Sequence, residues 1–304
     1  MRLGRRSFNL SYRRQLVLFL TPYLVGTLAL VVLPALMTVT VSFTNYQGYE
    51  APTWAGLDNF RRLAQTPLVR LGLYNTLVFA GVAVPLRLVG ALVLALLLGG
   101  RRSLRAGSGL YRAAVYLPTI VPEAAYALVW LWIVNPVYGP LNMILGAFGL
   151  PQPSWLTEPG TARMAIILMA LMQLGEGFVV VLAARQNVPA ALYEAAEVDG
   201  ANRWQGFWRI TLPLITPWLL LLACRDLLVA VQNTFTPSFV LAYGGPYYAT
   251  TFLPLLIYEV WFDFSEWGLA SAVLVVVYVW ILLLIVGIRN LIEGLRGRVE
   301  AGEG

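Results

Sequence analysis

The sequence predicts an all-α integral membrane protein, and three observations support this class. The chain has 304 residues, of which 59% are hydrophobic and only 12% are charged, whereas soluble domains carry about 25% charged residues. Several apolar segments exceed the length of about 20 residues that an α-helix needs to cross a bilayer. The arginines gather beside the ends of these segments, which is the pattern that sets membrane orientation.

We predict six membrane spans. The first contains no charged residue and is too long for the core of a cleaved signal peptide, so we expect it to stay in the protein. The third contains Pro118 and Pro122, which are expected to bend it. A bent or broken helix is tolerated in a membrane only where protein or a water-filled cavity covers its backbone, and this favours a gated pathway. The predicted spans are residues 16–43, 71–98, 110–134, 162–184, 213–242 and 267–288.

The positions of the arginines predict which ends face the cytoplasm. Fifteen of the 21 arginines fall in the two terminal tails and in the loops after spans two and four, and four fall on the opposite side. Basic residues favour the cytoplasmic side. Residues 1–15 and 289–304 are therefore predicted to be cytoplasmic tails of one six-span domain, residues 16–288. The outward segments 44–70, 135–161 and 243–266 are rich in turn-forming residues and are expected to be surface loops with short helices.

The composition excludes several functions. The chain has no histidine, which removes His-ligated metal sites and His-based nucleophile triads. It also has no lysine, and a P-loop ATPase needs its lysine on the phosphates. The single cysteine, Cys224, cannot form an internal disulfide. We therefore predict that this chain is not an enzyme and holds no metal or cofactor, and that its net charge of +6 reflects the membrane rather than nucleic acid.

The loop between spans four and five carries the most specific pattern. Asn187 is predicted to cap a helix with Pro189 in its first turn. Alanines at 190, 191, 195 and 196 favour a helix of little bulk, which a partner can approach closely. Gly200 stands where this helix is expected to end, and a second helix carries Trp204, Phe207 and Trp208. By itself the loop also fits an interfacial helix, although its acidic residues Glu194, Glu197 and Asp199 suit an anionic leaflet poorly.

This loop resembles the "EAA" loop of binding-protein-dependent ABC importer permeases. The resemblance is carried by Glu194-Ala195-Ala196, by Asp199-Gly200-Ala201, by Trp204 and Phe207, and by the run from Ile210 to Pro217. It implies that residues 189–199 form a coupling helix that sits in a cleft of a separate ATPase, within a coupling loop of about 185–217. The residues implied to couple to the ATPase are Glu194, Ala195, Ala196, Asp199, Gly200 and Ala201, with Gly200 as the turn and Glu194 as the acidic contact.

Further motifs are similar to the sugar-permease branch of this family, of the MalF/UgpA type. They are residues 42–45, 56–63 and 75–77, the pairs Tyr111-Arg112 and Leu117-Pro118, and the run Tyr243-Gly244-Gly245-Pro246. The resemblance implies a MetI/MalF-like type I importer fold in the inner membrane. It also implies four kinds of partner besides the lipid bilayer: a second homologous permease, two copies of an ABC ATPase that binds ATP and Mg, an extracytoplasmic solute-binding protein, and a small-molecule sugar.

Five charged residues lie well inside the predicted spans, where a charge is costly unless it faces protein or water. They are Arg87, Glu123, Glu176, Arg225 and Asp226. They either line the translocation path or pair with one another and fix the helix packing, and both interpretations stay open. Gly175 and Gly177 flank Glu176 and are expected to allow a close helix approach or a kink.

Sugars need planar polar groups for their hydroxyls and aromatic faces for their C–H surfaces, and the family is thought to hold substrate on the later spans. The predicted substrate-pathway residues are Tyr126, Trp130, Gln173, Glu176, Gln232 and Asn233, and Trp132 is a further aromatic candidate. An alternative function is an ion- or proton-coupled secondary carrier that uses the buried carboxylates. That alternative predicts inverted repeats, which we do not find, and it leaves the 189–217 loop without a purpose.

Overall fold

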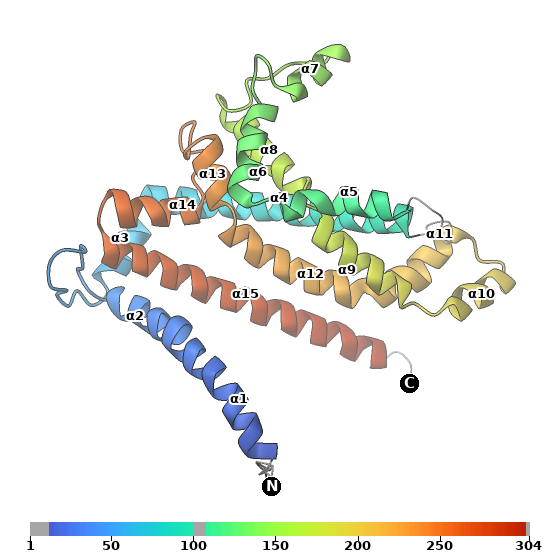
Figure 1. Cartoon of the computed structure of the whole chain (residues 1–304), viewed down its shortest axis with the longest axis horizontal. Helices are drawn as coiled ribbons and strands as arrows, with labels where there is room; N and C mark the ends of the chain where they lie inside the picture. Colours follow the sequence, from blue (N-terminus) through green and yellow to red (C-terminus); the bar gives the residue numbers. More distant parts are fainter. Residues whose placement is uncertain (1–11, 100–107, 302–304) are drawn as a thin grey trace, which may run out of the picture. The chain divides into compact units, whose positions relative to one another are not determined.

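The computed structural model describes residues 12–99 and 108–301, and its regular secondary structure there is helical (Figure 1). The chain divides into two compact units. One contains the residues up to 65 together with 260–278, and the other contains 66–259 together with the residues from 279 onward. The predicted cytoplasmic arginines at positions 2, 5, 6, 101, 102 and 105 lie outside the described residues.

Four helical segments are long and apolar enough to cross a membrane unaided, namely Arg14–Val41, Pro67–Leu98, Arg203–Ala242 and Trp267–Gly287. The two other predicted spans are bent pairs of helices. Gly109–Ile120 and Glu123–Ile133 meet at 101°, and Pro159–Leu171 and Gly175–Gln186 meet at 45°. Counting each bent pair as one span gives up to six spans, so the multi-pass class is confirmed, whereas the number six remains a prediction.

The first unit is built on a continuous apolar helix. Its parts are α1 (Tyr12–Thr27), η1 (Leu28–Val32) and α2 (Leu33–Val41). The short helix α3 (Asp58–Gln65) is tied to the end of α2 through Asn59, which is 3% exposed. The side-chain amide of Asn59 donates to the carbonyls of Ser42 and Thr44 at 2.9 and 2.8 Å. The predicted short helix in the outward segment 44–70 is thus confirmed.

The second unit packs around α4 (Pro67–Leu98), which contacts α8 (Pro159–Leu171), α9 (Gly175–Gln186) and α12 (Leu212–Gln232). Two apolar clusters lie along α4. One surrounds Phe79 and Ile166, and the other surrounds Ala91 and Phe178. Small residues on α4 such as Ala91 and Ala95, which are 2% and 0% exposed, let neighbouring helices approach closely.

The expected bend in span three is present between α5 (Ser108–Ile120) and α6 (Glu123–Ile133). Pro122 has no N–H to donate, and it restricts the residue before it to extended conformations. The α-helix therefore stops at Ile120 and restarts at Glu123 in a new direction.

Span five begins earlier than we predicted. The second helix of the preceding loop, α11 (Arg203–Gly206), continues through η3 (Phe207–Thr211) into α12 without a break. Pro213 does not interrupt it, and it lies just after the π-helical turn η3, where the hydrogen-bond ladder already departs from the regular α-helical pattern. The aromatic helix of the loop and the membrane span are therefore one rigid element.

Three further predictions about connecting segments are settled by the structure. The outward segment 135–161 contains the expected short helix, α7 (Pro140–Ala147). The segment 243–266 is not simply a surface loop, because residues 249–253 and both Leu255 and Leu256 are at most 1% exposed. The last helix, α15 (Trp267–Ala301), extends past residue 288, so the predicted C-terminal tail is helical as far as Ala301. An apolar, threonine-rich segment can be buried although its polar and apolar residues do not alternate regularly. The sequence pattern therefore did not predict that residues 249–256 are largely buried.

Candidate functional site

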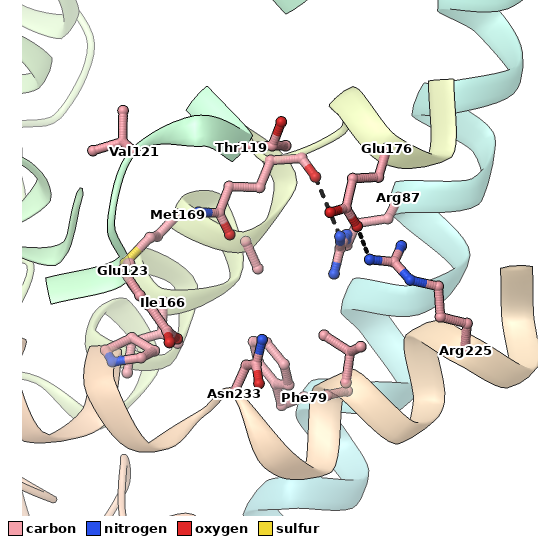
Figure 2. A pocket seen from close by; sticks show the side chains of 15 residues that line it. Phe79, Arg87, Thr119, Val121, Glu123, Ile166, Met169, Glu176, Arg225 and Asn233 are labelled. Atoms are coloured by element: carbon pink, nitrogen blue, oxygen red, sulfur yellow. Dashed lines mark hydrogen bonds and ion pairs between the residues drawn. The ribbon is translucent and has the colours of Figure 1, made fainter. Parts of the chain in front are cut away.

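The second unit encloses a cavity of about 320 Å³ that is lined by both polar and apolar side chains (Figure 2). Phe79 and Arg87 reach it from α4, and Ile166 and Met169 reach it from α8. Its polar lining also includes Thr119, Glu123, Gln173, Glu176, Arg225 and Asn233. The volume lies at the lower end of the range of small-molecule sites.

Three helix breaks meet at this cavity. Thr119 and Val121 flank the bend between α5 and α6, Gln173 lies in the gap between α8 and α9, and Asn233 is the residue at which α12 ends. Non-helical backbone at membrane depth is stable only where protein or a water-filled space satisfies it. The convergence of the breaks on one polar cavity therefore marks the hydrated part of the membrane domain.

Four charged residues at the cavity form one continuous chain of ion pairs, whereas Glu123, which also lines the cavity, lies outside this chain. Arg87 Nε lies 3.7 Å from Asp226 Oδ2, and Arg225 Nη1 lies 3.2 Å from the other oxygen of Asp226. Arg225 also pairs with Glu176, toward which it points in Figure 2. Asp226 and Arg87 are the buried members, with side chains 5% and 14% exposed. Two arginines balance two carboxylates, so the mutual-pairing interpretation of Arg87, Arg225 and Asp226 agrees with the geometry.

Arg87 also supplies a hydrogen-bond donor for the backbone at the break in span four. Its Nη2 donates to the carbonyl oxygen of Gln173 at 3.2 Å. Gln173 lies between α8 and α9, so its carbonyl has no place in a regular helical ladder. A single guanidinium thus joins the ion pair with α12 to the broken backbone of span four.

The helix α9 restarts at Gly175 in close contact with α5. A methyl group built on Gly175 would lie 2.8 Å from Tyr116 Cα and 2.9 Å from Thr119 Oγ1. Gly177 allows a similar approach of α4, since its added carbon would lie 3.3 Å from Ala91 Cβ. The predicted close helix approach at the glycines that flank Glu176 is present.

Replacing Gly175 by alanine is expected to destabilise the fold by about 1–3 kcal/mol, because the new methyl group meets backbone rather than a movable side chain. The measurement is the thermal unfolding midpoint of the purified protein in detergent. Gly160→Ala is the matched control, since Gly160 is also helical and a methyl group there meets nothing within 4 Å. Equal midpoints for the two variants would contradict this packing.

The six predicted pathway residues divide into two groups. Gln173, Glu176 and Asn233 line the cavity. Tyr126 and Trp130 do not, because both are 7% exposed and lie in the apolar cluster around Phe79. The hydroxyl of Tyr126 donates to the carbonyl of Met169 at 3.0 Å, which anchors α6 to α8. Gln232 is exposed but is not part of the cavity wall.

The expectation that Tyr126 and Trp130 offer their faces to a sugar is therefore not met in this structure. On α6, which restarts after the 101° turn at Pro122, Tyr126 and Trp130 pack into the apolar cluster, whereas Trp132 is 54% exposed. Thr119, which we did not single out, lines the cavity in their place. Its position directly after Pro118, in a segment with two prolines, is the sequence signal that could have identified it.

The coupling loop has a compact geometry that is set by its backbone. Its first helix, α10 (Ala190–Val198), follows Pro189, while Asn187 ends the preceding helix α9 instead of capping α10 as predicted. At its C-terminus, the N–H of Ala201 donates to the carbonyl of Ala196 at 2.8 Å, and the N–H of Gly200 donates to that of Glu197 at 3.1 Å. These two bonds form a Schellman motif, which needs the left-handed φ of +78° that Gly200 adopts.

The second half of the loop is held by side chains. Asn202 and Gln205 form a reciprocal capping box at the start of α11, with bonds of 2.9 and 2.8 Å. The hydroxyl of Tyr193 on α10 hydrogen-bonds to that of Thr211 at 2.8 Å, and Thr211 is 4% exposed. This bond connects α10 to the helix that continues as span five. The sequence analysis did not identify this pair, because the two residues lie 18 positions apart and no local pattern relates them.

The outer surface of α10 combines small alanine side chains with the exposed acidic residues Glu194 and Glu197. None of its residues is buried within the chain, and Val198 is 88% exposed. The six predicted coupling residues, from Glu194 to Ala201, all lie on α10 or on its Schellman turn. Within residues 12–99 and 108–301, no group of three or more His, Cys, Asp or Glu side chains is placed to hold a metal ion.

Comparison with known proteins identifies the family. Residues 91–295 match the family described as "Binding-protein-dependent transport system inner membrane component". The chain is 35% identical over 281 residues to the probable ABC transporter permease protein YesP of Bacillus subtilis, covering 90% of this chain and 87% of the relative. It is 31% identical over 279 residues to the trehalose/maltose transport system permease protein MalF of Thermococcus litoralis, covering 90% and 92%.

The fold is also shared with a solved transporter. A chain in the crystal structure of a bacterial alginate ABC transporter, in complex with an alginate pentasaccharide-bound periplasmic protein, matches with a TM-score of 0.76 and 25% identity. The match covers 91% of this chain and 94% of that chain. The protein is therefore a multi-pass ABC transporter permease subunit and belongs to the binding-protein-dependent transport system inner membrane component family.

Proposed function

We propose that the chain forms half of the translocation pathway of an ATP-driven carbohydrate importer. The relatives named above as a trehalose/maltose permease and as part of an alginate transporter support a saccharide as the substrate. The complex would contain a second homologous permease, two copies of an ABC ATPase and an extracytoplasmic solute-binding protein. Both termini and the loop 185–212 would face the cytoplasm, in accordance with the arginine distribution.

The observation that carries the proposed coupling role is the construction of α10. It is an exposed helix of small residues, closed by a glycine turn and bonded through Tyr193 to Thr211 at the start of span five. An ATPase that moves α10 therefore also moves α12, and α12 carries Arg225 on the cavity wall. Force applied at the loop can thus reach the pathway through one continuous helix.

The cavity supports a polar, uncharged group as the cargo. Gln173 and Asn233 offer amide donors and acceptors, and Thr119 offers a hydroxyl. The guanidinium of Arg225 is already paired with two protein carboxylates, and that of Arg87 with one. These ion pairs account for Glu176 and Asp226 without a coupling ion. Glu123 lines the cavity outside this network, so it is the carboxylate on which an ion-coupled mechanism would depend.

The test is gentle co-purification followed by reconstitution. The tagged chain is expected to retain an ABC ATPase, and proteoliposomes containing the complex are expected to take up the sugar only with internal ATP and the binding protein. Uptake by the isolated chain without an ATPase would overturn the proposal and favour the ion-coupled alternative.

Glu194→Lys is expected to lower binding-protein-stimulated ATP hydrolysis by about tenfold or more, because it reverses the charge on an exposed helix that is proposed to enter the ATPase cleft. The readout is phosphate release by the complex in nanodiscs. Glu50→Lys is the matched control, since Glu50 is also exposed and lies on the segment between α2 and α3. Equal hydrolysis by the two variants would argue against the docking role.

A further inference from the structure

A short loop of the second unit displays three tyrosines. We name residues 243–248, between α13 (Phe235–Leu241) and α14 (Leu253–Tyr258), the tyrosine loop. Tyr243, Tyr247 and Tyr248 are 51%, 87% and 56% exposed. The residues that follow directly, 249–253, are at most 1% exposed. A deeply buried segment thus supports a strongly exposed aromatic surface.

The backbone of the tyrosine loop is held in an uncommon conformation. Tyr243, Tyr247 and Tyr248 have φ values of +43°, +50° and +59°, in the left-handed region that bulky residues rarely adopt. Residues kept in such conformations concentrate at ligand-contacting sites, where the surrounding structure enforces them. Three instances within six residues call for a functional explanation of this loop.

The surrounding structure does enforce this conformation. The side-chain amide of Asn75 on α4 donates to the carbonyls of Tyr248 and Thr251 at 2.8 and 3.0 Å. Arg163 on α8 donates from Nε to the carbonyl of Ala249 at 2.9 Å, and Ser238 on α13 donates to that of Thr250. Hydrogen bonds from three different helices therefore fix the buried segment 249–251 and the carbonyl of Tyr248. Thr250 and Thr251 of that segment donate in turn to the carbonyls of Gly245 and Gly244 at 2.7 and 3.2 Å, which holds the loop against this support. Binding to a rigid aromatic surface costs little conformational entropy.

The chemistry of the surface fits an uncharged ligand. No charged residue occurs between positions 227 and 258. The tyrosine rings offer apolar faces, and their phenol groups both donate and accept hydrogen bonds. Saccharides combine apolar C–H faces with hydroxyls, so they match both features of this surface.

The position of the loop relates it to the pathway. Pro237 on α13 lines the cavity, and the tyrosine loop begins six residues later, at a distance of about 9 Å if the helical rise of 1.5 Å per residue is kept. The coupling loop precedes α12 and the tyrosine loop follows α13, so they lie at opposite ends of this segment (Figure 1). A solute that enters from the side opposite the ATPase would meet the tyrosine loop before the cavity.

We propose that the tyrosine loop is a saccharide-binding platform at the outer mouth of the pathway, on which Tyr247 and Tyr248 stack against the sugar before it enters the cavity. The inference rests on the proposed import function. It gives the pathway a second sugar-contact site besides the cavity. It also explains the uncommon backbone conformation, which keeps the tyrosine rings exposed.

The experiment uses the assembled complex in nanodiscs, without the binding protein, and maltose as the probe. Saturation-transfer NMR reports maltose that contacts the protein. Tyr247→Asn removes the ring but keeps a residue that tolerates the left-handed region, and Tyr247→Phe keeps the ring. We expect Tyr247→Asn to lower the saturation transfer to maltose about three- to tenfold. We expect the transfer with Tyr247→Phe to stay within about twofold of the wild-type value. Because Tyr247 is 87% exposed, both variants are expected to assemble as well as the wild type in size-exclusion chromatography.

Two kinds of outcome would overturn the proposed platform. One concerns saturation transfer to maltose, which would be equal for the wild type and Tyr247→Asn, or absent for the wild type. The other is severalfold weaker docking of the unliganded binding protein to Tyr247→Asn, measured by titration, which would reassign the loop to a protein contact. Failure of the proposed import function is distinguishable, because a chain that purifies without an ATPase or transports without one fails a different assay.

Discussion

Gly200→Val is expected to abolish substrate-stimulated ATP hydrolysis while the protein still inserts into the membrane. Gly200 has a φ of +78° and closes α10 through the Schellman bonds to Ala196 and Glu197. A β-branched residue in this region costs roughly 1–3 kcal/mol. A nine-residue helix has little stability of its own, so the strain is relieved by rebuilding the turn. Rebuilding the turn displaces the helix from its partner, and we expect a loss of about tenfold or more in the stimulated rate.

Two variants separate the role of the turn from a general cost in stability. Gly200→Asn is expected to keep most of the activity, because asparagine tolerates the left-handed conformation. Gly149→Val carries the same backbone penalty elsewhere, since Gly149 has a φ of +69° and, like Gly200, no neighbour within 4 Å of an added carbon. The measurement is phosphate release by the reconstituted complex. If Gly149→Val lost as much stimulation as Gly200→Val, the effect would not belong to the coupling loop.

Asp226→Leu is expected to be the most destabilising single substitution around the cavity. It removes the carboxylate 3.7 Å from Arg87, whose side chain is 14% exposed. Removing one partner of a buried ion pair costs about 3–5 kcal/mol, because the remaining charge is left largely buried without its counter-charge. We expect the apparent melting temperature in detergent to fall by roughly 5–10 °C. Arg87→Leu is expected to cost less, since Asp226 keeps Arg225 at 3.2 Å.

The double variant Arg87→Leu/Asp226→Leu tests whether the cost comes from an unpaired charge. It is expected to melt above Asp226→Leu alone, because no buried charge is left without its partner. It is expected to stay below the wild type, because the carbonyl of Gln173 loses its donor. A double variant that melts at or below Asp226→Leu would show that the network does not act through charge pairing.

The patterns that depend on neighbouring residues were predicted well. The bend at Pro122 follows from the missing N–H of proline, and the turn at Gly200 follows from the freedom of glycine at positive φ. The apolar lengths identified the four long helices and both bent pairs. Each of these depends on a few adjacent residues, so a single sequence contains the necessary information. The capping role of Asn187 failed because two helices compete for that residue, and α9 takes it.

The patterns that depend on packing were predicted poorly. Residues 249–256 resembled a loop and are core, because Asn75, Arg163 and Ser238 supply the hydrogen bonds that their backbone needs. Tyr126 and Trp130 resembled sugar contacts and are packed, because α6 meets α4 and α8 in the apolar cluster around Phe79 and Ile166. The pairing of Arg87 with Asp226 joins residues more than 130 positions apart in the sequence, and no local pattern relates them.

Taken alone, the sequence determined that this is an arginine-only, multi-pass membrane protein with an alanine-rich helix and a glycine turn between two late apolar segments. Only the tertiary structure decided that three helix breaks share one cavity, that two arginines and two carboxylates beside it form a neutral network, and that three tyrosines are exposed on one loop. The physical reason is the range of the interactions. Helix propensity and proline or glycine geometry act within one turn of a helix, whereas charge pairing and backbone satisfaction in a membrane depend on helices that meet only after folding.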